Sequence, residues 1–271
     1  MGSYSEETAS AIENTAKGNV VQICAVTHDF TTPAGDQMQA VSDINLEIEG
    51  GEFVAIVGPS GCGKTTLLNI VSGLIEPTSG LVRVAGELVK GVREDVGYMP
   101  ARDSLLPWRT CQANVELPLE LQGRLGRTGR RERAKALLQA VGLSGFESHY
   151  PSALSHGMRQ RASVARTFVS HPAVLLMDEP FSALDAQTRV VIQDVFLRIW
   201  ESEHQSVLLI THDVLEAVAL ADRVVVLSGR PGTIRATHQI ALPRPRLVKQ
   251  LLFEEPRFQA YVRDIWGDLD A

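Results

Sequence analysis

The sequence predicts an α/β protein whose core is a mostly parallel β-sheet. Three observations support this fold class. Short apolar runs that suit strands buried on both faces recur along the chain, as in residues 53–57 (FVAIV). Segments with helical periodicity alternate with these runs, and a glycine-rich loop at 58–65 joins one run directly to a helical segment. Strands that alternate with helices in this way build a parallel sheet covered by helices.

The predicted elements follow one another in a regular order. Besides residues 53–57, we expect strands at 20–26, 44–48, 82–85, 96–99, 174–177, 206–210 and 223–227. Helices are expected at 64–71, 186–203 and 214–221. Between residues 105 and 169 the helical pattern dominates, most clearly at 131–141. The middle of the chain, about residues 102–170, is therefore predicted to be a helical subdomain inserted into the sheet.

We expect one folded domain with an extension at each end. The first 19 residues are polar and acidic, contain no apolar run, and are predicted to form a disordered tail. The domain itself is expected to span residues 20–242. Residues 243–271 form a C-terminal extension, which opens with the helix-hostile sequence Pro-Arg-Pro-Arg and ends in a short amphipathic helix.

Composition excludes several classes of protein. Apolar residues make up 44% of the chain and charged residues 21%, as in globular proteins rather than disordered or coiled-coil chains. With 26 basic against 32 acidic residues, the net charge of −6 does not favour nucleic acid as a partner. No stretch approaches 18 uncharged apolar residues, so we do not expect the chain to span a membrane. Three scattered cysteines fit neither a disulfide framework nor a zinc site and predict the reducing cytoplasm.

The glycine-rich loop has the spacing of a phosphate-binding loop. Residues 58–65 (GPSGCGKT) match the pattern GxxxxGK[ST]. Glycines let consecutive backbone N–H groups form an anion-binding concavity, to which the following helix adds its positive N-terminal end. Lys64 would reach the β- and γ-phosphates, and the Thr65 hydroxyl would ligate Mg²⁺. The candidate nucleotide-binding residues are Gly58, Pro59, Ser60, Gly61, Cys62, Gly63, Lys64, Thr65 and Thr66.

Two further apolar strands end in residues suited to catalysis. Residues 174–177 deliver Asp178 and Glu179 to the carboxyl end of a strand, where open α/β sheets bind ligands. We predict that Asp178 holds Mg²⁺, directly or through water, and that Glu179 is the general base that polarises the attacking water. His212 follows another strand, and we expect it to contact the γ-phosphate and to orient the water and Glu179. Taken alone, an Asp-Glu strand end or a single histidine is more often structural, but the phosphate loop favours catalysis.

Three more segments resemble a known family. Residues 151–161 (PSALSHGMRQR) resemble the signature segment of ABC ATPases, which reads LSGGQ and is followed by a helix. Residues 182–185 (SALD) resemble the D-loop of that family, and residues 211–213 (THD) resemble its His switch. The resemblance covers about residues 20–242, which is nearly all of the expected domain.

Three segments resemble one branch of this family. Residues 105–110 (LLPWRT), 158–161 (MRQR) and 242–246 (LPRPR) are similar to the nucleotide-binding subunits of nitrate, taurine, aliphatic sulfonate and bicarbonate importers. The resemblance implies a P-loop NTPase core with an N-terminal antiparallel β portion and a helical subdomain. It also implies ATP and Mg²⁺ as cofactors, and a head-to-tail dimer of two nucleotide-binding subunits, identical or different, that traps two ATP molecules.

The resemblance assigns further site residues and partners. In such a dimer Ser155, Gly157 and Met158 would face the partner's γ-phosphate, and Asp185 of the D-loop would lie nearby. Phe30 is the best placed aromatic to stack on adenine, although an ordinary core or turn phenylalanine is the alternative. Membrane permease subunits would bind near Leu105–Arg109, with a substrate-binding protein as an indirect partner. The chain would then lie peripherally on the cytoplasmic face of the inner membrane.

Two positions depart from the family pattern. Ala101 stands where the family has the Q-loop glutamine, which touches Mg²⁺ and water and couples the site to the permease. A methyl group can do neither. His156 replaces the first glycine of the signature and adds a titratable side chain there. We expect hydrolysis to persist but to be slow and weakly coupled.

Several alternatives remain open on the sequence alone. Six basic residues between 124 and 135 would form either a solvated helix face or a contact with lipid headgroups or the permease. Trp108 would be either an anchor for the permease or part of the core of the lobe. A soluble ABC ATPase that acts on nucleic acid, a small-molecule kinase and a degenerate regulatory subunit are the alternative functions.

Overall fold

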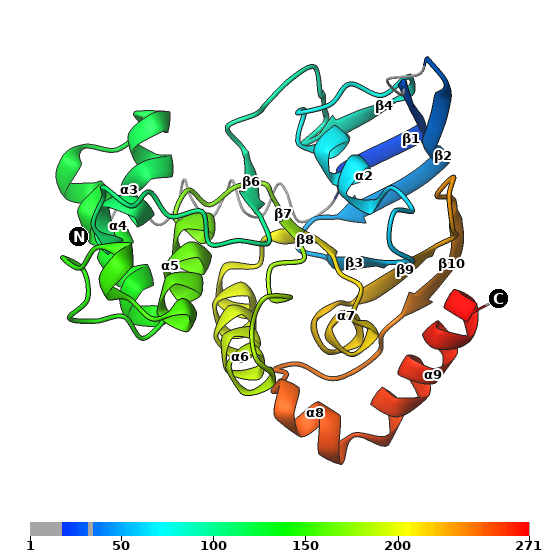
Figure 1. The fold of residues 1–271 in the computed structure, drawn as a ribbon. Helices are drawn as coiled ribbons and strands as arrows, with labels where there is room; N and C mark the ends of the chain where they lie inside the picture. The colour runs from blue at the N-terminus through cyan, green and yellow to red at the C-terminus, as the bar shows by residue number, and fades with distance from the viewer. Residues whose placement is uncertain (1–17, 32–34, 271) are drawn as a thin grey trace.

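The described part of the chain folds into two β-sheets, and helices pack mainly on the larger one (Figure 1). The computed structural model describes residues 18–31 and 35–270. The smaller sheet is antiparallel, with the spatial order β2 (Gln37–Glu49), β1 (Asn19–Thr31), β4 (Ser79–Val84) and β5 (Glu87–Leu88). The larger sheet has the order β10 (Ile234–Gln239), β9 (Arg223–Leu227), β3 (Phe53–Val57), β8 (Ser206–Ile210), β7 (Val174–Asp178) and β6 (Val96–Met99). Its neighbours are parallel except for β10 and β9, which confirms the predicted mostly parallel α/β core.

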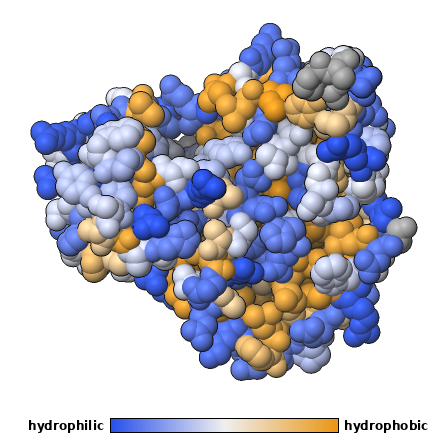
Figure 2. Space-filling model, in the orientation of Figure 1, coloured by the Kyte–Doolittle hydropathy of each residue, from blue (hydrophilic) through white to orange (hydrophobic). Residues whose placement is uncertain are grey.

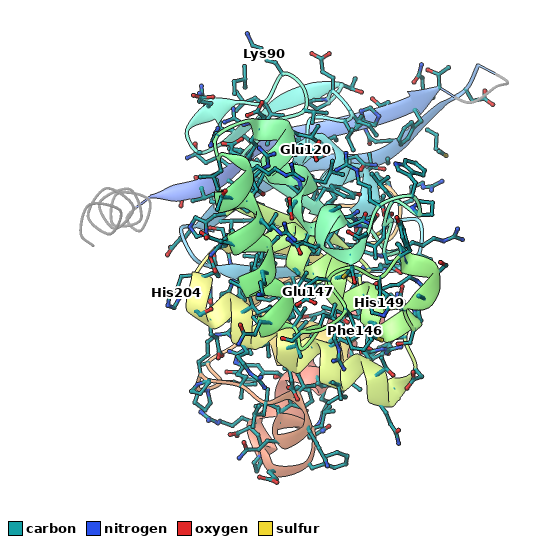
Figure 3. All side chains as sticks on the ribbon, turned by 90° about the vertical axis from the view of Figure 1, so that its left-hand side faces the viewer. Lys90, Glu120, Phe146, Glu147, His149 and His204 are labelled. Atoms are coloured by element: carbon teal, nitrogen blue, oxygen red, sulfur yellow. The ribbon has the colours of Figure 1, made fainter. Side chains whose placement is uncertain are left out.

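One helix, α2, lies between the two sheets, and the others cover the opposite face of the larger sheet (Figure 1). These helices are α2 (Lys64–Val71), α6 (Ala186–Glu203), α7 (Val214–Leu220), α8 (Val248–Glu254) and α9 (Pro256–Asp270). A lobe between β6 and β7 contains α3 (Cys111–Gln122), α4 (Arg127–Ala140), the 3₁₀ turn Pro151–Ala153 and α5 (His156–Phe168). This lobe projects from one side of the sheet, and Figure 3 shows it from its outer end.

The central strands are buried on both faces, and their side chains alternate between two cores. On β3, Val54 and Ile56 pack toward α2 and the smaller sheet. Phe53, Ala55 and Val57 pack on the opposite face against the helices. Because neighbouring residues of a strand point to opposite faces, a run of five apolar residues supplies both cores at once.

The bounds predicted from the sequence are accurate for the strands of the larger sheet's centre and less accurate for the strands at the edges of the fold. Every strand predicted in the larger sheet is present within one residue of its expected bounds. The antiparallel edge strand β10 was not predicted, because its residues are only half-buried and alternate with exposed ones. β1 and β2 are each 13 residues long and extend well beyond the predicted runs. The predicted N-terminal tail lies outside the described residues, apart from Gly18 and Asn19, and Asn19 is the first residue of β1.

The C-terminal extension contains two helices instead of one short helix. After the Pro-Arg-Pro-Arg segment, α8 is followed by the 15-residue helix α9. α9 packs against α7, β9 and β10 through its buried residues Phe258, Val262 and Ile265. On the face shown in Figure 2, apolar residues gather toward α7, α8 and α9, whereas the helical lobe is mostly polar.

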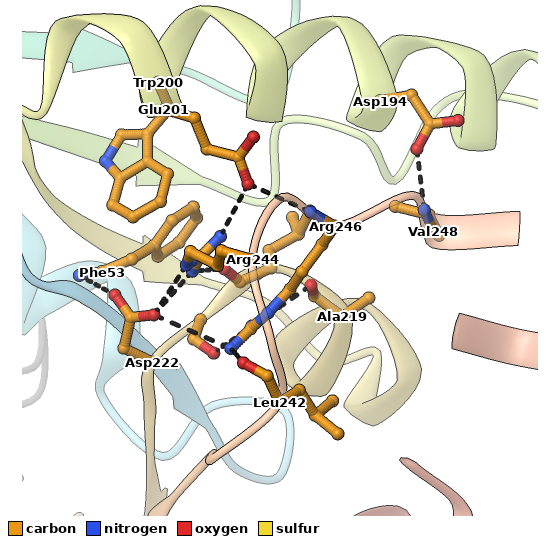
Figure 4. Close-up of polar contacts among 12 residues, drawn as sticks. Phe53, Asp194, Trp200, Glu201, Ala219, Asp222, Leu242, Arg244, Arg246 and Val248 are labelled. Atoms are coloured by element: carbon orange, nitrogen blue, oxygen red, sulfur yellow. Dashed lines mark hydrogen bonds and ion pairs between the residues drawn. The ribbon is translucent and has the colours of Figure 1, made fainter. Parts of the chain in front are cut away.

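Arg246 fixes the start of this extension in the interior (Figure 4). Its guanidinium donates hydrogen bonds to the carbonyls of Ala219, Ala221, Ile240 and Leu242. Its side chain is almost fully buried, and burial lowers the pKa of the guanidinium to about 10. Two of these carbonyls lie at the C-terminal end of α7 and two lie in the segment after β10, so one side chain joins both to the extension.

A second cluster beside it reaches the sheet. Arg244 lies over the ring of Trp200, with its Cζ atom 4.2 Å from the ring centroid, and donates to Asp222 at 2.7 Å. The other carboxylate oxygen of Asp222 accepts a hydrogen bond from the backbone N–H of Phe53 at 3.1 Å. The extension is therefore connected through Arg244 and Asp222 to the first residue of β3.

The substitution Arg246→Met should lower the free energy of unfolding by about 3 kcal/mol. Methionine retains most of the apolar stem, but the buried carbonyls lose their donor, and an unpaired buried polar group costs about 1–3 kcal/mol. Urea unfolding monitored by circular dichroism measures the change. Arg263→Met, on the exposed face of α9, is the matched control and should change stability by less than about 0.5 kcal/mol. Equal stability of the two variants would contradict the anchoring role.

Candidate active site

An open pocket of about 240 Å³ lies where β1, β2 and the loop after β3 meet. Its lining residues are Phe30, Met38, Ala40, Ser60, Gly61, Gly63, Lys64, Thr65, Thr66, Glu179 and Arg230. Most of the predicted nucleotide-binding residues are therefore adjacent to one cavity. The loop that carries them connects the buried strand β3 to the N-terminus of α2, as the motif requires.

The phosphate-binding loop is built around Gly63, which caps α2. Gly63 has a φ of 96°, and a Cβ atom at this position would lie 2.6 Å from the carbonyl oxygen of Ala40. Only glycine can adopt this conformation in this space without strain. The Lys64 side chain is folded back over the loop, and its Nζ atom donates to the carbonyls of Gly58 at 2.7 Å and Pro59 at 3.0 Å. The ammonium group is thereby held beside the concavity.

Thr65 and Asp178 meet on the floor of the site. The Thr65 hydroxyl donates to Asp178 Oδ1 at 3.2 Å, although the two residues are 113 positions apart in the sequence. Burial raises the pKa of the Asp178 carboxyl. Burial, followed by the charge of Asp178, raises the pKa of the neighbouring Tyr98 hydroxyl to about 12. A hydroxyl and a carboxylate oxygen side by side form a donor set suited to Mg²⁺, which commonly takes one or two protein ligands and completes its shell with phosphate and water oxygens.

Glu179 and His212 form a pair at the rim of the site. His212 Nδ1 lies 3.1 Å from Glu179 Oε2, and both side chains are accessible to solvent. Glu179 has a φ of 47°, a conformation that is uncommon for a residue other than glycine. Its backbone is held there by a hydrogen bond from its N–H to Ile210 and by two hydrogen bonds from Ser182 to its carbonyl. A carboxylate held next to an imidazole can accept a proton from water while the imidazole orients it.

Phe30 is not a core residue. Its side chain is 37% exposed and lines the pocket. The ring of His28 packs edge-on against it, with the ring centroids 4.6 Å apart, and so supports the aromatic face from β1. The structure therefore excludes the alternative of a buried phenylalanine and leaves Phe30 available for stacking.

The remaining predicted residues lie elsewhere on the chain. Ser155, Gly157 and Met158 form the N-terminal turn of α5, where the Ser155 hydroxyl accepts a hydrogen bond from the Met158 N–H at 3.3 Å. Asp185 caps α6 and accepts a hydrogen bond from the Thr188 N–H, which lowers the pKa of its carboxyl. None of these four residues lines the pocket. Within one chain, the structure brings together the phosphate loop and the two strand ends but not the predicted signature residues.

Comparisons with known proteins agree with this arrangement. A sequence profile of the ABC transporter family matches residues 41–182. An uncharacterized ABC transporter ATP-binding protein of Methanocaldococcus jannaschii is 49% identical over 223 residues, which cover 82% of this chain and 83% of that protein. This chain belongs to the ABC transporter family. The nitrate import ATP-binding protein of Synechocystis is 46% identical over 230 residues, which cover 83% and 86% of the two chains.

A solved structure supports the fold of the cassette directly. An ATP-binding cassette crystallised as a dimer in a post-hydrolysis state with ADP and phosphate superimposes with a TM-score of 0.71 and 31% identity. The match covers 82% of this chain and all of that one. The P-loop NTPase core and the ATPase activity predicted for this chain are confirmed by these relationships. Across residues 18–31 and 35–270, no helix of the cassette is both long enough and apolar enough to cross a bilayer.

Side-chain contacts connect His156 with the segment that follows Ala101. His156 is the first residue of α5 and is exposed, and its Nδ1 atom lies 3.3 Å from Arg159 Nη2. Arg159 also donates to the carboxylate of Asp103 at 2.9 Å, and Asp103 is only two residues beyond Ala101. The carbonyls of Asp103 and Ser104 accept hydrogen bonds from Arg166 of α5. The segment after Ala101 is thus connected to the signature helix, although Ala101 itself offers no polar side chain.

The segment expected to contact the permease is only partly exposed. Leu105 is buried in the core and offers no contact surface, whereas Trp108 is 71% exposed, which excludes a role in the core of the lobe. The buried amide of Asn114 accepts from the N–H of Leu106 and donates to three carbonyls of the segment, at Leu106, Arg109 and Thr110. Asn114 therefore fixes the turn that presents Trp108 to solvent.

The basic segment around α4 is mostly exposed in the single chain, as both a solvated face and a contact surface require. Arg133 pairs with Glu203 of α6 at 2.9 Å, and Arg124 lies 3.7 Å from Glu94. Arg127 and Arg131 are exposed. On the same lobe, Arg109 pairs with Glu120 at 2.6 Å, and Figure 3 shows Glu120 on the face that points away from the sheets.

Sequence reasoning missed some residues that border the site. Met38 and Arg230 line the pocket, and Gln160 of α5 donates to the carbonyl of Pro180, directly after Glu179. Met38 could have been found from the pairing of Phe30 with Met38 across β1 and β2, once that register was known. For Arg230 the only signal was the Arg-Pro-Gly turn after the last predicted strand.

Glu216 lies buried beneath the His212 loop. Its carboxylate accepts a hydrogen bond from Gln193 of α6 at 2.8 Å, and Asp213, three residues earlier, caps the same helix. Burial raises the pKa of Glu216 to about 7 from an ordinary value of 4.5. The folded state therefore binds this proton more tightly than the unfolded state, so Glu216 lowers the stability as the pH rises from about 4.5 to 7.

The substitution Glu216→Gln should make the stability less dependent on pH. A glutamine still accepts a hydrogen bond from Gln193 but never ionises. The stability of the variant minus that of the wild type should therefore be larger at pH 8 than at pH 5. At about 1.4 kcal/mol per pKa unit, the difference is roughly 3 kcal/mol. Urea unfolding at both pH values measures it, with the exposed Glu132→Gln as control. An offset between variant and wild type that is equal at pH 5 and pH 8 would contradict the assignment.

Proposed function

We propose that this chain is the ATP-hydrolysing subunit of a membrane importer and that two such subunits close head to tail on two ATP molecules. The observation that carries the proposal is the convergence of three strand ends. Lys64, the Thr65–Asp178 pair and the Glu179–His212 pair lie at the same edge of the larger sheet. These groups provide phosphate binding, metal binding and water activation, which are the three requirements of nucleotide hydrolysis.

The phosphate loop would hold the nucleotide. The backbone N–H groups of residues 58–66 and the N-terminus of α2 attract the phosphates, and Lys64 exchanges its contacts with the loop carbonyls for the β- and γ-phosphates. Phe30 stacks on the adenine at the other end of the pocket. Thr65 and Asp178 hold Mg²⁺, which when bound neutralises charge on the phosphates.

Glu179 and His212 would complete the hydrolytic machinery. The Glu179 carboxylate accepts the proton of the attacking water as the oxygen approaches the γ-phosphorus and the bond to the β-phosphate oxygen breaks. His212 lies 3.1 Å from that carboxylate, so it can fix the orientation of Glu179 and donate a hydrogen bond toward the γ-phosphate. ADP and phosphate are the products.

The dimer explains why the signature residues lie outside the pocket. Ser155, Gly157 and Met158 begin a helix whose N-terminus attracts anions, and they do not line the pocket of their own chain. A second cassette, placed head to tail, would bring its γ-phosphate to this turn and to Asp185. The partner is a second copy of this chain or another cassette.

The transport role follows from the relatives rather than from the pocket. The nitrate importer subunit and the branch resemblance favour a small oxyanion such as nitrate, taurine or another sulfonate as cargo. The chain would lie peripherally on the cytoplasmic face of the inner membrane. Permease subunits would bind near the exposed Trp108, and a substrate-binding protein would take part indirectly. Because Ala101 and His156 replace two residues of the hydrolytic machinery, a regulatory cassette that hydrolyses ATP slowly is the second candidate.

The substitution Glu179→Gln should reduce ATP hydrolysis by about a hundredfold or more, since a positioned general base contributes roughly 10²–10⁴-fold. ATP binding should persist, because Glu179 is not part of the phosphate loop. Phosphate release and nucleotide titration measure the two effects. The control Glu132→Gln, on the exposed face of α4, should hydrolyse ATP at the wild-type rate. If Glu179→Gln also hydrolyses ATP at that rate, Glu179 is not the base.

The double substitution Ala101→Gln with His156→Gly should accelerate hydrolysis by about tenfold in the assembled transporter. It restores a group that can contact metal and water and removes a bulky side chain from the signature turn. The loss of one stabilising group typically costs about 10²–10³-fold, which sets the upper limit of the gain. An unchanged rate would refute the idea that these residues slow the enzyme.

The complex for this measurement should be purified through a tag on this chain from detergent-solubilised native membranes. Mass spectrometry should identify a multi-span permease in it, and the presence or absence of a second ATPase distinguishes a heterodimer from a homodimer. Ribosomal or other soluble partners without a permease would contradict the importer function.

A further inference from the structure

The loop between β9 and β10 forms part of the wall of the pocket. Within it, the Ser228 hydroxyl accepts a hydrogen bond from the Thr233 N–H at 2.9 Å, and the Ser228 N–H donates to the Thr233 carbonyl at 2.9 Å. These contacts close the loop on itself. Its shape is therefore determined locally, before it meets the rest of the pocket.

This loop is also held tightly between β2 and the phosphate loop. The Gly232 N–H donates to the Ala40 carbonyl, and the Ser42 N–H donates to the Gly232 carbonyl, both at 2.9 Å. A Cβ atom on Gly232 would lie 2.0 Å from the carbonyl oxygen of Cys62. Only a glycine fits against Cys62 here, so Gly232 allows the loop that carries Arg230, two residues earlier, to pack against the phosphate loop.

Arg230 spans the pocket wall from the phosphate loop to the aromatic end. Its Nε and Nη2 atoms donate to the Gly61 carbonyl at 3.2 and 3.0 Å. Its Nη1 atom points to Met38 Sδ at 2.9 Å, and Met38 pairs with Phe30 across the two strands. The guanidinium thus lies between Phe30, the proposed platform for the base, and the loop that would hold the β- and γ-phosphates.

Arg230 is a cation of the pocket with one nitrogen that lacks a strong acceptor. Arg230 and Lys64 are the cations among the residues that line the pocket. Two nitrogens of Arg230 are occupied by a good acceptor, the Gly61 carbonyl, but Nη1 faces a thioether, which is a weak acceptor. A phosphate oxygen would bind Nη1 far better, because hydrogen bonds between two charged groups are about twice as strong as neutral ones.

We propose that Arg230 is a nucleotide-binding residue, which holds the Gly61 peptide with one edge of its guanidinium and donates from Nη1 to the α-phosphate of the nucleotide. The α-phosphate is the group that lies between the base and the two distal phosphates. It is shared by ADP and ATP, so Arg230 contributes equally to the binding of both. This inference rests on the proposed function, because it requires that the pocket receives ATP.

The test compares nucleotide affinity across variants of the full-length chain. Arg230→Met retains the apolar stem and removes the charge, and we expect it to weaken the binding of ADP and ATP by the same factor, about tenfold. Arg230→Lys retains the charge but not the planar guanidinium that donates to two acceptors at once, and it should recover part of the lost affinity. Arg263→Met removes the same charge from the exposed face of α9 and should bind both nucleotides as the wild type does. Isothermal titration of the wild type and the three variants with Mg-ADP and with Mg-ATP at 4 °C measures the eight affinities.

Two readouts separate direct contact from a merely structural role. If Arg230 only positioned Gly61, its removal would affect ATP more than ADP, since ATP has an additional phosphate in the loop, and the loss would be independent of salt. A direct contact with the α-phosphate gives an equal loss that becomes smaller between about 0.1 and 0.5 M salt because of screening. The first pattern would overturn the proposal, and the second would support it.

The remaining outcomes distinguish this inference from the proposed function. A wild-type chain that binds ADP and ATP, together with an Arg230→Met variant that binds them equally well, overturns the role of Arg230 alone. A wild-type chain that binds neither nucleotide overturns the proposed function and this inference with it. Thermal unfolding of each variant confirms that the fold is retained before affinities are compared.

Discussion

The site depends on the parallel, in-register pairing of β3, β8 and β7. Ile56 lies opposite Ile210, and Ile210 lies opposite Asp178, so the three strands end at one level. The backbone continues this order beyond the strands, because the Thr211 N–H donates to Ile56 and the Glu179 N–H donates to Ile210. A shift of one residue in either pairing would turn the side chains to the opposite face and separate Thr65, Asp178 and His212.

The opposite end of the same sheet is fixed by the C-terminal extension. Asp222 accepts the N–H of Phe53 at the start of β3, and Arg244 donates to the other oxygen of that carboxylate. Arg246 adds four hydrogen bonds to carbonyls around α7, the helix that follows the His212 loop. The extension therefore stabilises the register of the strands that carry the site, although it lies far from the pocket in the sequence and contributes no residue to its lining.

Much of this arrangement could be predicted because it depends on local pattern. The run FVAIV, the spacing GPSGCGKT and the two strand ends at Asp178 and His212 each contain their own signal, since a buried strand and an anion-binding turn need particular residue types at particular spacings. Arg230 and Met38 carried no such signal. They enter the pocket through the pairing of β1 with β2 and through the fit of Gly232 against Cys62, which are decided only when distant segments meet. The exposure of Trp108 was equally open, because it follows from the hydrogen bonds of Asn114 to the preceding turn.

In the proposed dimer, each ATP site is formed by two chains, and Ala101 and His156 of one chain would belong to different sites. In that dimer Ala101 would lie near the nucleotide of its own chain, whereas His156 lies in the turn that would face the nucleotide of a partner. In a homodimer each of the two sites would then contain both changes. In a heterodimer with an ordinary cassette each site would contain one change, so pairing would restore neither site completely. Asp103 and Arg159 also connect the segment after Ala101 to His156 through side-chain contacts, so both positions adjoin one polar network of the chain. The substitutions Ala101→Gln and His156→Gly therefore form a coupled pair, and their separate effects on the rate of hydrolysis need not be additive.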